Sequence, residues 1–158
     1  LLALLLIGGG LQALVGVVTA FTVAHSITLA LATLDLVALP SRLVESAIAL
    51  TIAWVALENV LFDQSRGRWR IVFLFGLVHG FGFAAILRAM HLPTQSLAVS
   101  LFAFNVGVEA GQMVIVLLAY PVITAIQRAP QRRMIVSTVS SLIFTLALYR
   151  FVERAFLA

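Results

Sequence analysis

The sequence predicts an all-α fold, a polytopic transmembrane helical bundle. Hydrophobic residues make up 63% of the 158 residues and charged residues only 10%, against about 45–50% and about 25% in an average soluble domain. The mean hydropathy is +1.15. Apolar runs of the length that a helix needs to cross a bilayer, about 20 residues, recur along the chain. We therefore expect the lipid bilayer to be the first partner of this protein.

Six apolar runs define the expected helices in chain order. Residues 1–7 make about half a span, and complete spans follow at residues 11–34, 43–62, 71–90, 96–120 and 134–156. We expect five complete helices and one truncated first helix, six in total, in a single transmembrane domain over residues 1–158. Because the first run is incomplete, we expect the natural protein to continue upstream. The runs lack the two-residue alternation of a transmembrane barrel.

Prolines are expected only at the ends of these helices, where a missing N–H and a fixed φ are tolerated best. The four prolines are Pro40, Pro93, Pro121 and Pro130, and each lies at the edge of an apolar run or between two runs. We therefore expect no proline kink inside a span.

Arginine placement predicts the orientation of the bundle. If successive helices alternate in direction, six arginines lie on one side, namely Arg66, Arg68, Arg70, Arg128, Arg132 and Arg133. The other side holds Arg42, Arg88, Arg150 and Arg154. Because cytoplasmic loops carry the excess of basic residues, the first side is expected to be cytoplasmic. We therefore expect a multi-pass protein of the bacterial inner membrane with its C-terminus on the outer side.

Several classes of function find no support in the residues. The chain has no cysteine, which excludes disulfides, thiolate metal sites and cysteine nucleophiles. It also lacks a Gly-x-Ser-x-Gly elbow, a His-Glu-x-x-His motif and a phosphate-binding loop. The net charge of +4 comes from arginines that lie mostly between apolar runs. We expect no enzymatic activity, no nucleic-acid partner and no permanently bound cofactor.

Three ionisable side chains fall near the middle of predicted spans. They are His25, His79 and Glu109, and an ionisable group at the centre of a membrane helix costs about 2.5–3.5 kcal/mol on insertion scales. Imidazole nitrogens and carboxylate oxygens suit a borderline divalent ion such as nickel, cobalt or zinc. We expect the three side chains to meet in the bundle as transient metal ligands. The alternative is that each is satisfied by hydrogen bonds inside the core.

Six further polar residues are candidates for the path of an ion or for supporting its ligands. They are Thr22, Ser26, Glu45, Glu58, Asn105 and Gln112. Helical periodicity places the first two near His25 and the last two on the face of Glu109. The two glutamates fall toward opposite ends of the third helix. Each of the six can also serve structure alone, because such side chains form hydrogen bonds between membrane helices, worth about 0.6 kcal/mol on average.

Two glycine motifs predict close contacts between helices. Gly76-x-x-x-Gly80 lies in the fourth run and Gly107-x-x-x-Gly111 in the fifth, and this spacing lets two helix backbones approach each other. On the fifth helix the glycine face is nearly opposite the face of Glu109. One face of that helix is therefore expected to pack while the other lines a site.

Four short segments follow one another along the predicted helices. They are FTVAHSITL at residues 21–29, VESAIAL at 44–50, FGLVHGFGFA at 75–84 and FNVGVEAGQ at 104–112. In this order they resemble the HupE/UreJ family of bacterial membrane proteins, and the likeness covers residues 1–149. Members of that family are regarded as secondary permeases for nickel or cobalt that supply hydrogenase or urease assembly. The resemblance implies that His25, His79 and Glu109 are the signature residues of this chain.

Residues and resemblance together predict a secondary permease for a divalent transition-metal ion, with nickel the first expectation and cobalt the second. Ni²⁺, or else Co²⁺ or Zn²⁺, would be the transported substrate and not a resident cofactor. Two alternatives stay open, a non-transporting accessory subunit of a larger membrane assembly and a membrane-embedded metalloenzyme. Other membrane proteins, or further copies of the chain in a homo-oligomer, are also compatible partners.

Overall fold

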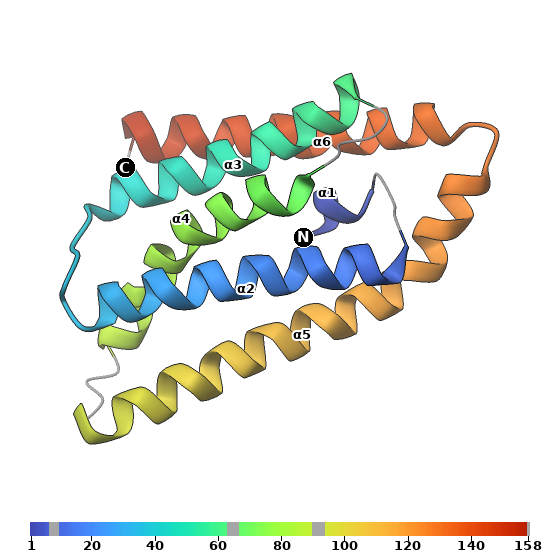
Figure 1. The fold of residues 1–158 in the computed structure, drawn as a ribbon. Helices are drawn as coiled ribbons and strands as arrows, with labels where there is room; N and C mark the ends of the chain where they lie inside the picture. The colour runs from blue at the N-terminus through green and yellow to red at the C-terminus, as the bar shows by residue number, and fades with distance from the viewer. Residues whose placement is uncertain (7–9, 63–66, 90–93, 158) are drawn as a thin grey trace.

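The computed structural model describes residues 1–6, 10–62, 67–89 and 94–157. Over these residues the chain forms a helical bundle without a β-strand (Figure 1). The helices are α1 (Leu2–Leu5), α2 (Leu11–Thr33), α3 (Ser41–Leu61), α4 (Arg68–Ala89), α5 (Thr94–Arg128) and α6 (Arg132–Val152). A short π-helical turn, η1 (Glu153–Leu157), continues α6. The expected all-α class is confirmed.

Four segments of the described chain are long and apolar enough to cross a membrane. They are Leu11–Thr33, Ser41–Leu61, Ser96–Arg128 and Arg132–Leu157. Helix α4 adds a further helix of 22 residues, whereas α1 is a single turn of 4 residues. The arrangement therefore agrees with five full-length helices preceded by a short first one.

The helices pack mainly in three pairs. Helix α2 packs along α4 and against α5, and α3 packs along α6. Helix α1 lies in the middle of the bundle and contacts α3 (Figure 1). Helix α5 lies at the edge, and only 6% of its most apolar stretch is buried. The interior that can hold a site is therefore formed chiefly by the first four helices and one face of α5.

The contact between α2 and α4 is made over the first glycine motif. A Cβ atom added at Gly76 would lie 2.6 Å from the carbonyl oxygen of Phe21 and 2.9 Å from Ala24 Cβ. A Cβ atom at Gly80 would overlap the hydroxyl of Thr28. Only glycine lets the two backbones approach this closely, so this motif packs as its spacing predicts.

The second glycine motif makes no comparable contact. A Cβ atom added at Gly107 or Gly111 would meet nothing within 4 Å among the described residues. These glycines lie on the outward side of α5. The expected close approach of a neighbouring helix at this motif is therefore not made within the described part of this chain.

Helix α5 is longer than the sequence predicts and contains a proline. It continues beyond residue 120 to Arg128, with Pro121 inside it, so the expectation that no proline lies within a span is wrong. Proline leaves one carbonyl of the preceding turn without its N–H donor, and membrane helices tolerate this through local adjustment. The last part of α5 turns away from the direction of its first part (Figure 1), as a proline favours. Pro93 and Arg66 lie outside the described residues.

Candidate metal-binding cavity

A cavity of about 270 Å³ lies among the first five helices. Most of its wall is apolar, and its polar side chains are His25 from α2, Thr51 from α3, His79 from α4 and Gln112 from α5. The two histidines singled out from the sequence therefore open into the same space. Because a water molecule occupies roughly 30 Å³ in the liquid, the cavity has room for several waters.

His25 is buried without a polar partner. The residue is 1% exposed, and neither ring nitrogen has a hydrogen-bond partner among the described residues. Its neighbours are aromatic, with ring centroids at 5.8 Å for Phe21, 5.4 Å for Phe83 and 6.4 Å for Phe104. A buried polar group without a partner costs about 1–3 kcal/mol. A water molecule could therefore pair with either nitrogen, and a cation with the one that carries no proton.

His79 is oriented by a neighbouring helix. Its Nε2 lies 2.9 Å from the hydroxyl oxygen of Thr51, and that hydroxyl donates its own proton to the carbonyl of Ile48 at 2.7 Å. Since a hydroxyl has one proton, Thr51 accepts from Nε2–H of His79. This leaves Nδ1 of His79 with a free lone pair, in the tautomer that a metal ligand needs. The ring of Phe21 contacts His79 as well as His25, at 5.3 Å between centroids.

Glu109 lies beside the cavity and does not line it. Its Oε1 accepts a hydrogen bond from the hydroxyl of Thr19 at 3.0 Å. One turn further along, the hydroxyl of Thr22 lies 3.2 Å from Oε1 of Gln112. These bonds join α2 to α5. Within the described ranges, no three His, Cys, Asp or Glu side chains are placed to hold one metal ion, and the ligand roles of His25, His79 and Glu109 stay predictions.

The remaining candidates lie apart from the cavity. Ser26 donates to the carbonyl of Thr22 at 2.6 Å, and Asn105 donates to the carbonyl of Leu101 at 2.8 Å. Both hydrogen bonds are local to one helix.

Glu45 lies in the first part of α3, at the end of that helix opposite to Glu58. Its Oε2 lies 3.0 Å from Nε of Arg154, in a partly exposed ion pair. Nearby, Arg42 donates to the carbonyl of Ala155 at 3.0 Å and 2.5 Å. The start of α3 and the end of the chain therefore lie at the same end of the bundle, as the alternation of helix directions predicts.

Comparison with known families decides where this chain belongs. The family model described as HupE / UreJ protein matches residues 1–154. The chain belongs to the HupE/UreJ family. This is a membrane family of the transporter type, associated with nickel and cobalt. Comparisons with curated proteins and with solved structures find no match.

Family and helices together make this HupE/UreJ protein a multi-pass membrane protein whose apolar helices contact lipid. The four resembling segments contribute differently to its interior. The segments with His25 and His79 line the cavity, as does Gln112 of the last segment. Glu45 of the second segment lies in a different, partly exposed pocket at the α3–α6 contact.

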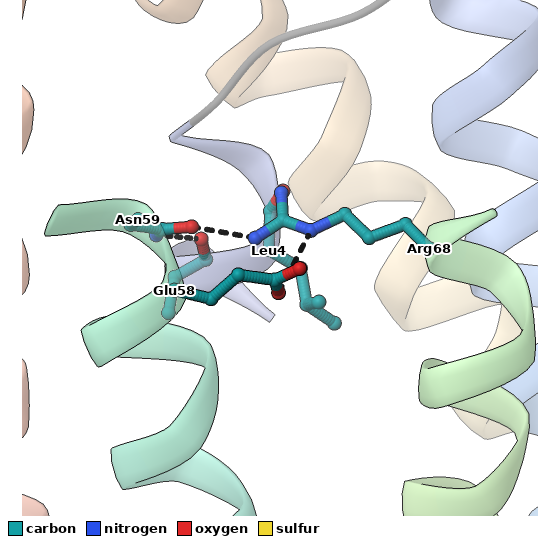
Figure 2. Close-up of polar contacts among 5 residues, drawn as sticks. Leu4, Glu58, Asn59 and Arg68 are labelled. Carbon is teal, nitrogen blue, oxygen red and sulfur yellow. Dashed lines mark hydrogen bonds and ion pairs between the residues drawn. The ribbon is translucent and has the colours of Figure 1, made fainter. Parts of the chain in front are cut away.

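A polar cluster of Glu58, Asn59 and Arg68 lies beside the cavity of this HupE/UreJ protein. The sequence analysis does not predict this cluster. Arg68 places Nε 3.7 Å from Oε2 of Glu58 and donates from Nη2 to Oδ1 of Asn59 at 2.5 Å (Figure 2). The side chains of Glu58 and Arg68 are each 10% exposed. Glu58 lies in the last turn of α3 and Arg68 begins α4. The short connection between two antiparallel helices is the signal that could have predicted this pair.

Proposed function

We propose that this HupE/UreJ protein is a secondary permease that carries a divalent transition-metal ion across the bacterial inner membrane. Ni²⁺ is the proposed substrate and Co²⁺ the second choice. The observation that carries the proposal is the shared cavity of His25 and His79, two imidazoles from separate helices, one of which has no polar partner. Neutral imidazole is a favoured ligand of borderline divalent ions. The association of the family with nickel and cobalt supports the same substrate class.

The cavity supplies a small number of protein ligands, which suits transport. The lone-pair nitrogen of His25 and Nδ1 of His79 would bind the ion, and water would complete its coordination. Oε1 of Gln112 has a second lone pair beyond the one facing Thr22 and can add an oxygen ligand. Conduction requires binding that is strong enough to select and weak enough to release. Two imidazoles with water provide weaker binding than a closed cage of four protein ligands.

Glu109 is proposed to act on the path of the ion outside the cavity. Its Oε1 is engaged by Thr19, but a carboxylate has about four lone-pair positions. The side chain can therefore bind a passing cation and still hold α2 on α5. The cytoplasmic side is proposed to be the end that carries Arg68, Arg128 and the other arginines of the larger set, by the positive-inside bias.

Metal uptake into proteoliposomes tests the proposal. We expect His25→Ala and His79→Ala each to lower the initial rate of Ni²⁺ uptake at least tenfold at low concentration, which is about 1.4 kcal/mol of lost interaction. Val108→Ala is the matched control, because Val108 lines the same cavity and has no ligand atom. Unchanged uptake in both histidine variants, at normal reconstitution, would contradict the ligand roles of His25 and His79. Uptake by the unmodified protein no faster than that of empty liposomes would contradict the permease and favour an accessory subunit.

A further inference from the structure

We propose that Glu58 is a second cation-binding position, at the Arg68 end of the cavity, and that Arg68 occupies it as a tethered cation. A divalent ion competes with Arg68 for the carboxylate, and its binding opens this end of the cavity. The identity of the competing ion rests on the proposed function. The closure by Arg68 rests on the geometry of the cluster alone.

The cluster adjoins the cavity, although its own side chains do not line it. Ala3 and Leu4 line the cavity, and their carbonyl oxygens accept hydrogen bonds from the cluster. Nδ2 of Asn59 donates to Ala3 at 2.6 Å, and Nη1 of Arg68 donates to Leu4 at 3.0 Å. Val55, one helical turn before Asn59, also lines the cavity. The contacts in Figure 2 therefore join α1, α3 and α4 beside the cavity.

The ion pair at the centre of the cluster is incomplete. The distance of 3.7 Å between Nε of Arg68 and Oε2 of Glu58 is too long for a hydrogen bond. Both atoms are buried, and neither has a hydrogen-bond partner among the described residues. The guanidinium is held away from the carboxylate because its other two nitrogens bind Leu4 and Asn59. Glu58 therefore has charge compensation and one buried oxygen that makes no hydrogen bond with the described residues.

A divalent ion is a stronger partner for that oxygen than the guanidinium. Its charge is twice as large, so its attraction at equal distance is doubled, and carboxylate oxygen is a common ligand of divalent metals. Arg68 stands at the first residue of α4, where the positive end of the helix dipole disfavours a cation. Once Glu58 binds another cation, Arg68 loses the main charge that holds it. Its departure also releases Leu4 and Asn59.

Labelling of a single introduced thiol tests the closure without any metal. The chain has no cysteine of its own, so Val55→Cys and Ala53→Cys each provide one target. Both positions are on α3 and 4% exposed, but only Val55 lines the cavity. We expect Arg68→Gln to raise the rate of maleimide labelling at Val55→Cys at least tenfold and to leave Ala53→Cys unchanged. Arg70→Gln, an exposed arginine of the same turn, should change neither.

Binding of Ni²⁺ to the purified protein tests the competition. We expect Arg68→Gln to tighten binding at least tenfold, and the addition of Glu58→Gln to remove the gain. An unchanged labelling rate, an equal rise at Ala53→Cys or an unchanged affinity would each overturn the proposal. Failure of the proposed function has a different readout, namely no Ni²⁺ uptake by the unmodified protein, or uptake that does not depend on His25 or His79.

Discussion

Alanine at the first glycine motif should force α2 and α4 apart. At Gly76 the added Cβ atom would lie 2.6 Å from the carbonyl oxygen of Phe21. Ordinary van der Waals contact between such atoms begins at 3.4 Å, so the helices must separate by about 0.8 Å. At Gly80 the added atom would also meet the backbone of His25 and Leu29. Overpacking of this kind costs about 1–3 kcal/mol. The same movement would displace the cavity residues that α2 carries.

The second glycine motif provides a matched control for this prediction. Alanine is a better helix former than glycine by up to about 1 kcal/mol, and this gain applies to Gly107 and Gly111 as it does to Gly76 and Gly80. The first variant carries alanine at Gly76 and Gly80, and the second carries alanine at Gly107 and Gly111. The difference between their free energies of unfolding therefore isolates the effect of packing between α2 and α4. We expect the first to be less stable than the second by about 1–3 kcal/mol in detergent unfolding followed by circular dichroism. Equal stability of the two variants would refute the assignment of the α2–α4 contact.

Three further substitutions test other contacts. Asn59→Leu removes two buried hydrogen bonds, and we expect a loss of about 1–3 kcal/mol in the same unfolding assay together with faster hydrogen exchange in α1. Thr22→Val removes the hydroxyl that lies 3.2 Å from Oε1 of Gln112 and should lower stability by about 0.6 kcal/mol; unchanged stability would contradict the assigned contact. Glu109→Gln keeps an oxygen that accepts from α2, so stability should be unchanged while Ni²⁺ uptake falls, and normal uptake would contradict its role on the path.

Helix positions follow from the sequence because the bilayer sets the length of an apolar run. The run at residues 11–34 and the helix Leu11–Thr33 differ by one residue at one end. The end of α5 does not follow, because Pro121 predicts a helix end at residue 120, whereas α5 continues to Arg128. A proline stops a helix in water more reliably than in a membrane, where the alternative for the backbone is an unsatisfied polar group in lipid. Hydropathy alone does not distinguish these outcomes.

The candidate site was only partly accessible to sequence reasoning. Periodicity assigns residues to a face of a helix, but the rotation of that helix against its neighbours is set by tertiary packing. His25 and His79 reach one cavity, whereas Glu109 contacts Thr19 at the contact between α2 and α5. The ion pair of Arg68 with Glu58 does not follow from hydropathy, because an arginine between two apolar runs predicts only the orientation of the bundle.

The ligand shell of Ni²⁺ bound to the purified protein tests the central claim most directly. X-ray absorption spectroscopy distinguishes imidazole from water and carboxylate ligands. The shared cavity predicts two imidazoles in the shell of the unmodified protein and one in either His25→Ala or His79→Ala. A shell without imidazole, or the same imidazole count in all three proteins, would contradict the claim.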